Sequence, residues 1–82
     1  MRERLVEIKV PWLAPNEPVV EVVRWLVEAG QLVEIDQDLL LLQVDGEEFI
    51  LPAPIDGTLI ELCVEAGEYL SEGQVIAVAR LI

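Results

Sequence analysis

An internal repeat is the sequence feature that most constrains how this chain folds. Residues 27–30 (VEAG) recur as residues 64–67 (VEAG), an offset of 37 residues, and Gln37 matches Gln74 at the same offset. Two copies of one short unit predict two similar halves related by a pseudo-twofold axis. In such a fold both termini lie at the end opposite the segment that joins the halves.

The upstream parts of the two halves align at a different offset. The pair Val10-Pro11 resembles Leu51-Pro52 at an offset of 41 residues, which is four more than the offset of 37 found downstream (41 − 37 = 4). We therefore expect the N-terminal half to carry about four extra loop residues, within residues 11–18 (PWLAPNEP).

Short apolar segments between turn residues indicate strands. Leu, Ile and Val supply 32 of the 82 residues, which excludes a disordered chain. The segments are short, and Gly, Pro and Asp residues separate them, as in a small all-β barrel or sandwich. Residues 19–27 also fit a helix by the spacing of their apolar side chains, but their many valines and the matching C-terminal segment favour a strand.

The pair Asp45-Gly46 separates two apolar runs, residues 39–44 (LLLLQV) and residues 47–51 (EEFIL). Asp-Gly between two such runs is typical of a type I′ turn, in which both central residues have positive φ. We therefore predict a tight β-hairpin that joins the two halves, with positive φ at Gly46.

The composition excludes several classes of function. The formal net charge is −11, which repels nucleic acid and anionic membranes, so we expect a protein partner. The absence of histidine and the scarcity of hydroxyl side chains disfavour an enzyme and a metal site. No apolar run approaches the roughly 20 residues of a membrane span, and a single cysteine, Cys63, closes no internal disulfide. We expect a cytoplasmic protein.

Taken in order, the motifs resemble those of the lipoyl/biotinyl domain family over residues 6–82. They are VEIKVP (6–11), VEVVRWLVEAGQLV (20–33), the Asp45-Gly46 hairpin, PAPIDG (52–57) and LIELCVEAGEYLSEGQVIAVA (59–79). The resemblance implies one domain over residues 1–82. Its fold would be a flattened β-barrel, or barrel-sandwich hybrid, of two four-stranded sheets. Asp45 and Pro52-Ala53-Pro54 are more similar to lipoyl domains of 2-oxo acid dehydrogenase acyltransferases than to biotinyl domains.

The resemblance also locates the position of cofactor attachment. Lipoyl domains carry Asp-Lys-Ala at the hairpin tip and biotinyl domains Met-Lys-Met, and the lysine lies eight residues before the second Pro of the Pro-Ala-Pro element. Counting back eight residues from Pro54 gives Gly46, flanked by Asp45 and Glu47. The attachment lysine is therefore absent. The chain's single lysine, Lys9, lies in the first expected strand, so the resemblance implies the fold without lipoyl or biotin.

Acidic residues suggest two further sites, and neither pattern is complete. Asp36, Asp38 and Asp45 do not form a calcium-binding loop, because LLLLQ follows Asp38 where such a loop needs a further ligand at its fifth position and Gly at its sixth. Glu47 and Glu48 lie in an exposed hairpin, without the pocket that separates the pKa values of a catalytic carboxylate pair. We therefore expect no metal site and no catalytic site.

The cysteine and the tryptophans have structural and functional interpretations. Cys63 matches Leu26 across the repeat, so we expect a core or half-buried thiol. Trp25 lies in an expected strand and fits the core. Trp12, beside Leu13 in a Pro-rich loop, is a candidate docking anchor for a protein partner.

The sequence therefore predicts a lipoyl-like domain that cannot be lipoylated and that is not an enzyme. It would act as a binding or assembly module, with subunits of a multienzyme complex as candidate partners. One alternative is a swinging-arm lipoyl or biotin carrier whose lysine is lost or replaced in this chain. A second is a structural domain of an efflux adaptor, which the tight Asp45-Gly46 turn disfavours because adaptors insert a long helical segment there.

Overall fold

The computed structural model describes residues 4–11 and 18–82. All regular secondary structure within these two ranges is β-strand, which confirms the predicted fold class. The segment that was ambiguous in sequence, residues 19–27, contains a strand. The strands are β1 (Leu5–Lys9), β2 (Val20–Trp25), β3 (Leu32–Val33), β4 (Asp38–Val44), β5 (Glu47–Pro52), β6 (Gly57–Leu62), β7 (Tyr69–Leu70) and β8 (Val75–Leu81).

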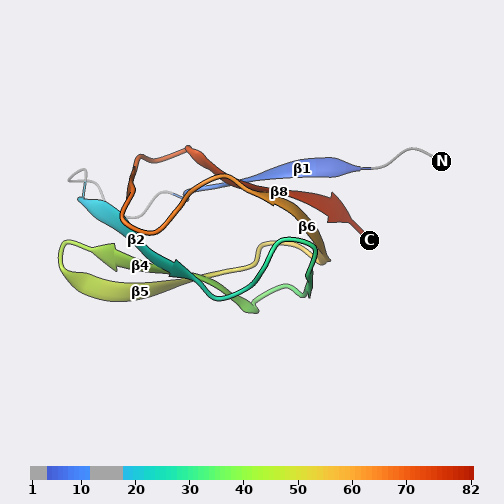
Figure 1. Ribbon diagram of the computed structural model, residues 1–82, viewed down its shortest axis with the longest axis horizontal. Coiled ribbons are helices and arrows are strands. Elements are labelled where there is room, and N and C mark those ends of the chain that lie inside the picture. The colour runs from blue at the N-terminus through green and yellow to red at the C-terminus, as the bar shows by residue number, and fades with distance from the viewer. Residues whose placement is uncertain (1–3, 12–17) are drawn as a thin grey trace.

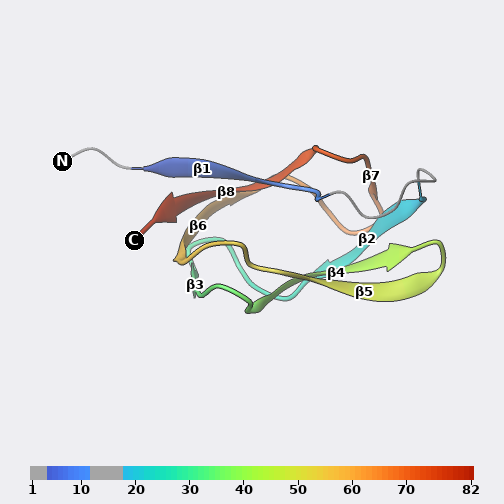
Figure 2. The ribbon, with the colours of Figure 1, turned by 180° about the vertical axis from the view of Figure 1, so that it is seen from behind.

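The strands form two four-stranded sheets. The first sheet has the order β1-β8-β6-β3 and the second sheet the order β5-β4-β2-β7, and every pairing is antiparallel. The sheets face each other in the views from both sides (Figures 1 and 2). The start of β1 and the C-terminus lie at the end opposite the β4–β5 turn (Figure 1), as the repeat predicted.

The core lies between the two sheets and is aliphatic. The completely buried side chains come from strands of both sheets, and they include Leu40 and Leu42 of β4, Leu59 of β6 and Ile76 of β8. A bulge in β4 lets Leu39 and Leu40 both point inward, which explains why this run shows no alternation in sequence. No described side chain that is polar or charged is buried.

Backbone hydrogen bonds repeat across the pseudo-twofold axis. The Gly30 N–H donates to the Leu59 carbonyl at 2.7 Å, and the Gly67 N–H donates to the Val22 carbonyl at 2.8 Å. Each residue in one bond is the counterpart of a residue in the other at an offset of 37 (67 − 30 and 59 − 22). The repeat seen in sequence is therefore a repeat of hydrogen bonding that ties the two halves together.

The upstream alignment predicted from sequence is wrong by two residues. The Val10 N–H donates to the Gln74 carbonyl at 2.9 Å, and the Ala53 N–H donates to the Gln37 carbonyl at 2.8 Å. Because Gln37 and Gln74 are themselves counterparts, Val10 is the counterpart of Ala53 at an offset of 43. The N-terminal half therefore carries six extra residues before β2 (43 − 37 = 6), and the sequence expectation was four. At this offset the counterpart of Val10-Pro11 is Ala53-Pro54. The sequence prediction was wrong because Leu51-Pro52, directly before that pair, is also an apolar residue followed by proline.

A second bulge decides the environment of Cys63. In β6 the register shifts between Leu59 and Glu61, which adds one residue and moves the following side chains to the opposite face. Val64 is consequently buried and Cys63 is exposed, so the expected core or half-buried thiol is wrong. The N-terminal counterpart, Leu26, is half-buried.

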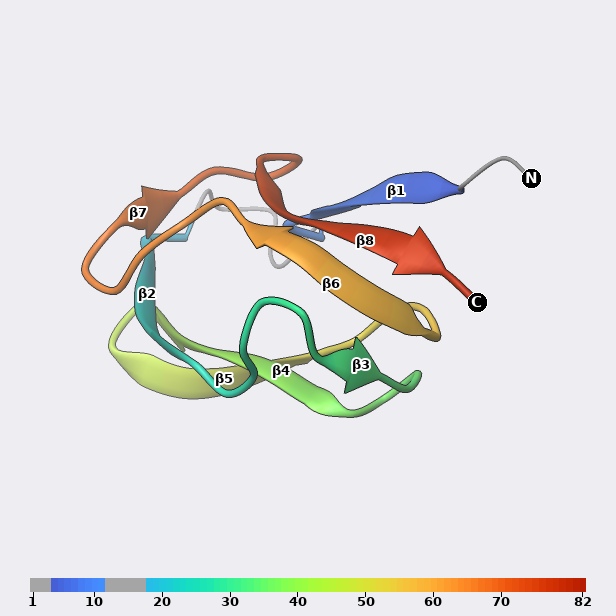
Figure 3. The same ribbon diagram turned by 45° about the vertical axis from the view of Figure 1, so that its right-hand side comes forward.

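Gly57 lies at the start of β6, in contact with β8. A Cβ atom at this position would collide with the Arg80 carbonyl, because the two backbones approach closely there. The short strand β3 pairs with this same part of β6, and β7 pairs with β2 in the other sheet (Figure 3). The glycine of the Pro52–Gly57 motif is thus a packing requirement of the first sheet.

Candidate functional site: the hairpin tip

The tip of the β4–β5 hairpin is the predicted attachment position, and it has the predicted form. Val44 pairs with Glu47, which leaves a two-residue turn of Asp45 and Gly46. The φ angles are 48° at Asp45 and 86° at Gly46. Positive φ at both residues is the property of a type I′ turn, which matches the right-handed twist of the two strands.

Asp45 is fixed to the start of β2 by two hydrogen bonds. The Val19 N–H donates to the Asp45 carboxylate Oδ1 at 2.9 Å. The Asp45 N–H donates to the Val19 carbonyl, also at 2.9 Å. The tip is therefore held in place against its neighbouring strand, and it is an ordered turn of the second sheet.

Gly46 occupies the position at which the resemblance places the attachment lysine, and it has no side chain. A Cβ built on Gly46 meets no described atom within 4 Å, so the site is open, but its φ of 86° strains any side chain that has a Cβ. Its neighbours Asp45 and Glu47 are both exposed acids. The tip therefore offers two carboxylates and no amine.

Lys9, the chain's single lysine, does not lie in the hairpin. It lies in β1 of the first sheet, pairs with Val75 of β8, and makes an ion pair with Glu7 at 4.0 Å. The tip belongs to the other sheet. Lys9 and Glu7 have exposed side chains, so this pair contributes little to stability.

The other candidates from sequence are not brought together at the tip. Trp25 is half-buried against the core, and its indole N–H donates to the Val64 carbonyl at 2.8 Å, which agrees with a structural role. The docking residues proposed from sequence, Trp12 and Leu13, lie outside the described residues. Within residues 4–11 and 18–82, no group of three or more acidic, cysteine or histidine side chains is placed to hold a metal ion.

The exposed thiol is poorly suited to nucleophilic chemistry. Desolvation by its surroundings raises the pKa of the Cys63 thiol above its ordinary value, and the charges of Glu61 and Glu7 raise this pKa further. Since the thiolate is the reactive form, these surroundings suppress reactivity at neutral pH.

Sequence reasoning missed one feature beside the tip, an exposed apolar pair in β5. Phe49 and Ile50 are 40% and 45% exposed, and the four residues Glu47 to Ile50 are all exposed. The sequence EEFI gives only a weak signal of this, because an apolar residue in a short strand is expected to point into the core.

Comparison with known proteins agrees with the fold. The family model Biotin_lipoyl, described as biotin-requiring enzyme, matches residues 6–79. No helix in the described part of the chain is long and apolar enough to cross a membrane.

Individual relatives are acetyltransferase components of pyruvate dehydrogenase complexes. The chain is 34% identical over 70 residues to the dihydrolipoyllysine-residue acetyltransferase component from Staphylococcus aureus strain Mu50, which covers 85% of this chain and 16% of the relative. It is 28% identical over 71 residues to the same component from Corynebacterium glutamicum, covering 87% of this chain and 10% of the relative. The chain thus spans only a small part of the length of these curated relatives.

Proposed function

This chain belongs to the biotin/lipoyl domain family, and we propose that it is a member that cannot be lipoylated or biotinylated and acts as a non-catalytic binding or assembly module. One observation carries the proposal: the residue at the expected attachment position is Gly46, in a well-defined turn, and the chain's single lysine, Lys9, lies in β1 of the other sheet. A carrier needs a nucleophilic amine on which the cofactor forms its amide bond, and this hairpin has none.

The geometry of the tip supports the absence of cofactor in a second way. Both residues beside Gly46 are exposed acids, and Asp45 is already bonded to Val19 through its carboxylate. A positive φ at Gly46 favours glycine over lysine, so the turn is locally adapted to the residue that it has. These features support a structural role for the hairpin tip, without an attached cofactor.

The partners proposed for the module are other subunits of a multienzyme complex in the cytoplasm. Support comes from the relatives, which are components of pyruvate dehydrogenase complexes. The net charge of −11 favours a partner with a basic surface and makes the association sensitive to salt.

Intact-mass spectrometry tests the proposal. The purified chain is incubated with ATP and either lipoate and a lipoate ligase or biotin and a biotin ligase, and a lipoyl domain with its lysine serves as positive control. The mass of this chain is expected to stay unchanged while the control is modified. A cofactor adduct on this chain, mapped by proteolysis to Lys9, would overturn the proposal.

A swinging-arm carrier whose lysine is lost in this chain is the second candidate. The open space around Gly46 favours it, because a Cβ atom built there meets no described atom within 4 Å apart from its chain neighbours. On this alternative, restoring the lysine restores modification, and the substitution is considered in the Discussion.

A further inference from the structure

Strand β5 is an edge of the second sheet along its whole length. Within the described part of the chain, β4 is its one neighbouring strand. An edge strand presents unpaired backbone N–H and C=O groups, which can pair with an added strand.

The direction of these backbone groups follows from the residue after the strand. The Ala53 N–H donates to the Gln37 carbonyl at 2.8 Å, and the Ala53 carbonyl accepts from the Asp36 N–H at 2.9 Å, so both groups of Ala53 point toward the β4 side. Along an antiparallel strand, successive residues point their backbone groups alternately to one side and the other. The backbone groups of Ile50 and Glu48 therefore point to the free edge.

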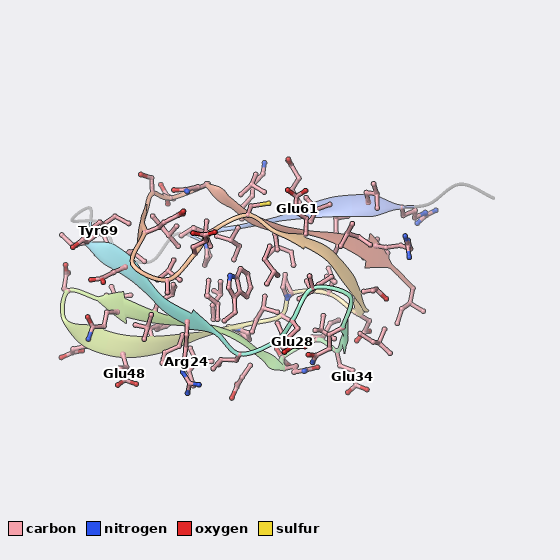
Figure 4. All side chains as sticks on the ribbon, in the orientation of Figure 1. Arg24, Glu28, Glu34, Glu48, Glu61 and Tyr69 are labelled. Atoms are coloured by element: carbon pink, nitrogen blue, oxygen red, sulfur yellow. The ribbon has the colours of Figure 1, made fainter. Side chains whose placement is uncertain are left out.

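Apolar side chains flank this free edge on both faces of the sheet. Ile50 pairs with Leu41, whose other partner is Arg24, so these three side chains form one row on the outer face. Phe49 pairs with the buried Leu42 and lies on the inner face, where it stays 40% exposed. Figure 4 shows Arg24 and Glu48 pointing away from the molecule on the side of the second sheet.

The pseudo-symmetric strand β1 provides a comparison within the same molecule. At the offset of 43, Ile50 corresponds to Glu7 and Pro52 corresponds to Lys9 (50 − 7 and 52 − 9). Edge strands commonly carry charged side chains that prevent pairing with other chains, and β1 has such a pair in Glu7 and Lys9. At the equivalent place β5 has an isoleucine that is 45% exposed.

We propose that the β5 edge binds an extended, basic and apolar segment of a partner protein, which pairs with Glu48 and Ile50 as an added strand. The inference rests on the proposed function as a binding module and gives that module a binding surface. Apolar and basic side chains of such a segment alternate between the two faces, so its apolar side chains would cover Ile50 on the outer face and its Lys or Arg side chains would lie near Glu47 on the inner face.

A second copy of this chain does not fit the same edge. Pairing two β5 strands would bring Glu47 and Glu48 of each copy to one interface, between molecules that each carry a net charge of −11. Like charges at short distance across paired strands are destabilising. Glu47 and Glu48 therefore disfavour self-association through β5 and favour a basic partner.

The test uses the full chain, labelled with ¹⁵N, and the peptide acetyl-Lys-Val-Lys-Val-Lys-Val-Lys-amide as probe. The expected result is saturable binding, with slower amide hydrogen exchange at Glu48 and Ile50. A peptide of the same composition with its four lysines contiguous has the same charge and lacks the alternating pattern. It should bind about tenfold more weakly if strand pairing and apolar contact contribute.

A pair of matched variants separates strand addition from simple attraction of charges. Ile50→Glu gives β5 the residue of β1 and is expected to weaken binding about tenfold, although it makes the chain more acidic. Leu5→Glu adds the same charge at the exposed Leu5 of β1 and should not weaken binding. Melting temperatures equal to that of the parent chain would show that both variants fold.

Three results would overturn the inference: no binding at millimolar peptide, unchanged exchange at Glu48 and Ile50, or tighter binding by Ile50→Glu. The mass measurement for cofactor attachment is independent of this titration. If the peptide fails to bind an unmodified chain, the proposed binding surface on β5 is refuted and the proposed absence of cofactor still stands.

Discussion

The carboxylate of Asp45 and the backbone of Val19 hold the hairpin tip to the neighbouring strand through two hydrogen bonds of 2.9 Å each. One bond comes from the Asp45 side chain and the other from its backbone. Asp45 also has a positive φ, which Asp and Asn tolerate better than most residues. Asp45, which the resemblance places beside the attachment position, therefore has a structural role of its own.

Replacement of Asp45 tests this role. Asp45→Ala removes the bond from Val19 and places alanine at a positive φ, so we expect a loss of about 1 kcal/mol in the free energy of unfolding. Asp45→Asn keeps an oxygen acceptor and should cost less. Urea denaturation measures both, and equal stability of the alanine variant and the parent would show that the bond contributes nothing.

The glycine at the tip is expected to be required by its backbone conformation. Gly46→Val places a β-branched residue at a φ of 86° and should destabilise the chain by roughly 1 kcal/mol or more. Gly46→Asn is the matched control, since asparagine tolerates positive φ. Thermal unfolding decides between them, and a melting temperature unaffected by valine would contradict the type I′ geometry.

Restoring an amine at the tip tests whether this hairpin is the attachment hairpin of the family. Gly46→Lys is expected to make the chain at least a poor substrate for a lipoate ligase, since a Cβ atom at this position meets no described atom within 4 Å apart from its chain neighbours. The strain of positive φ, on the order of 1 kcal/mol, acts against it. The exposed carboxylate of Glu47 also opposes modification, because it can pair with the new ammonium group.

The double variant Gly46→Lys with Glu47→Ala should therefore be modified faster than the single variant. Mass spectrometry after ligase treatment measures both rates, and Glu47→Ala alone is the control that should gain no mass. If neither lysine variant is modified while both fold normally, the alignment of residues 40–54 with the attachment hairpin is wrong.

The thiol of Cys63 should react slowly although it is exposed. Its raised pKa leaves less thiolate near neutral pH than an ordinary cysteine has, so alkylation by iodoacetamide should be slower in the folded chain than in urea. Glu61→Gln removes one of the charges that raise this pKa and should speed the reaction. Alkylation that is as fast when folded as when unfolded would contradict this expectation.

The strands and the hairpin could be predicted from sequence because they depend on local patterns. The valines of residues 19–27 favour an extended backbone, and Asp45-Gly46 favours one turn type through the φ angles that these two residues tolerate. The repeat at an offset of 37 extended this local information, because the same backbone bonds at Gly30 and Gly67 demand the same short sequence.

The fold class, the pseudo-twofold relation and the absence of lysine at Gly46 were therefore determined by the sequence itself. The partnering of strands decided the rest. Val10 is the counterpart of Ala53 because of the bonds that each makes to a distant loop, and Cys63 faces solvent because a bulge in β6 reverses the alternation. The exposure of Ile50 likewise follows from the position of β5 at a sheet edge, which is a property of the assembled sheet and of which the neighbouring residues give only a weak signal.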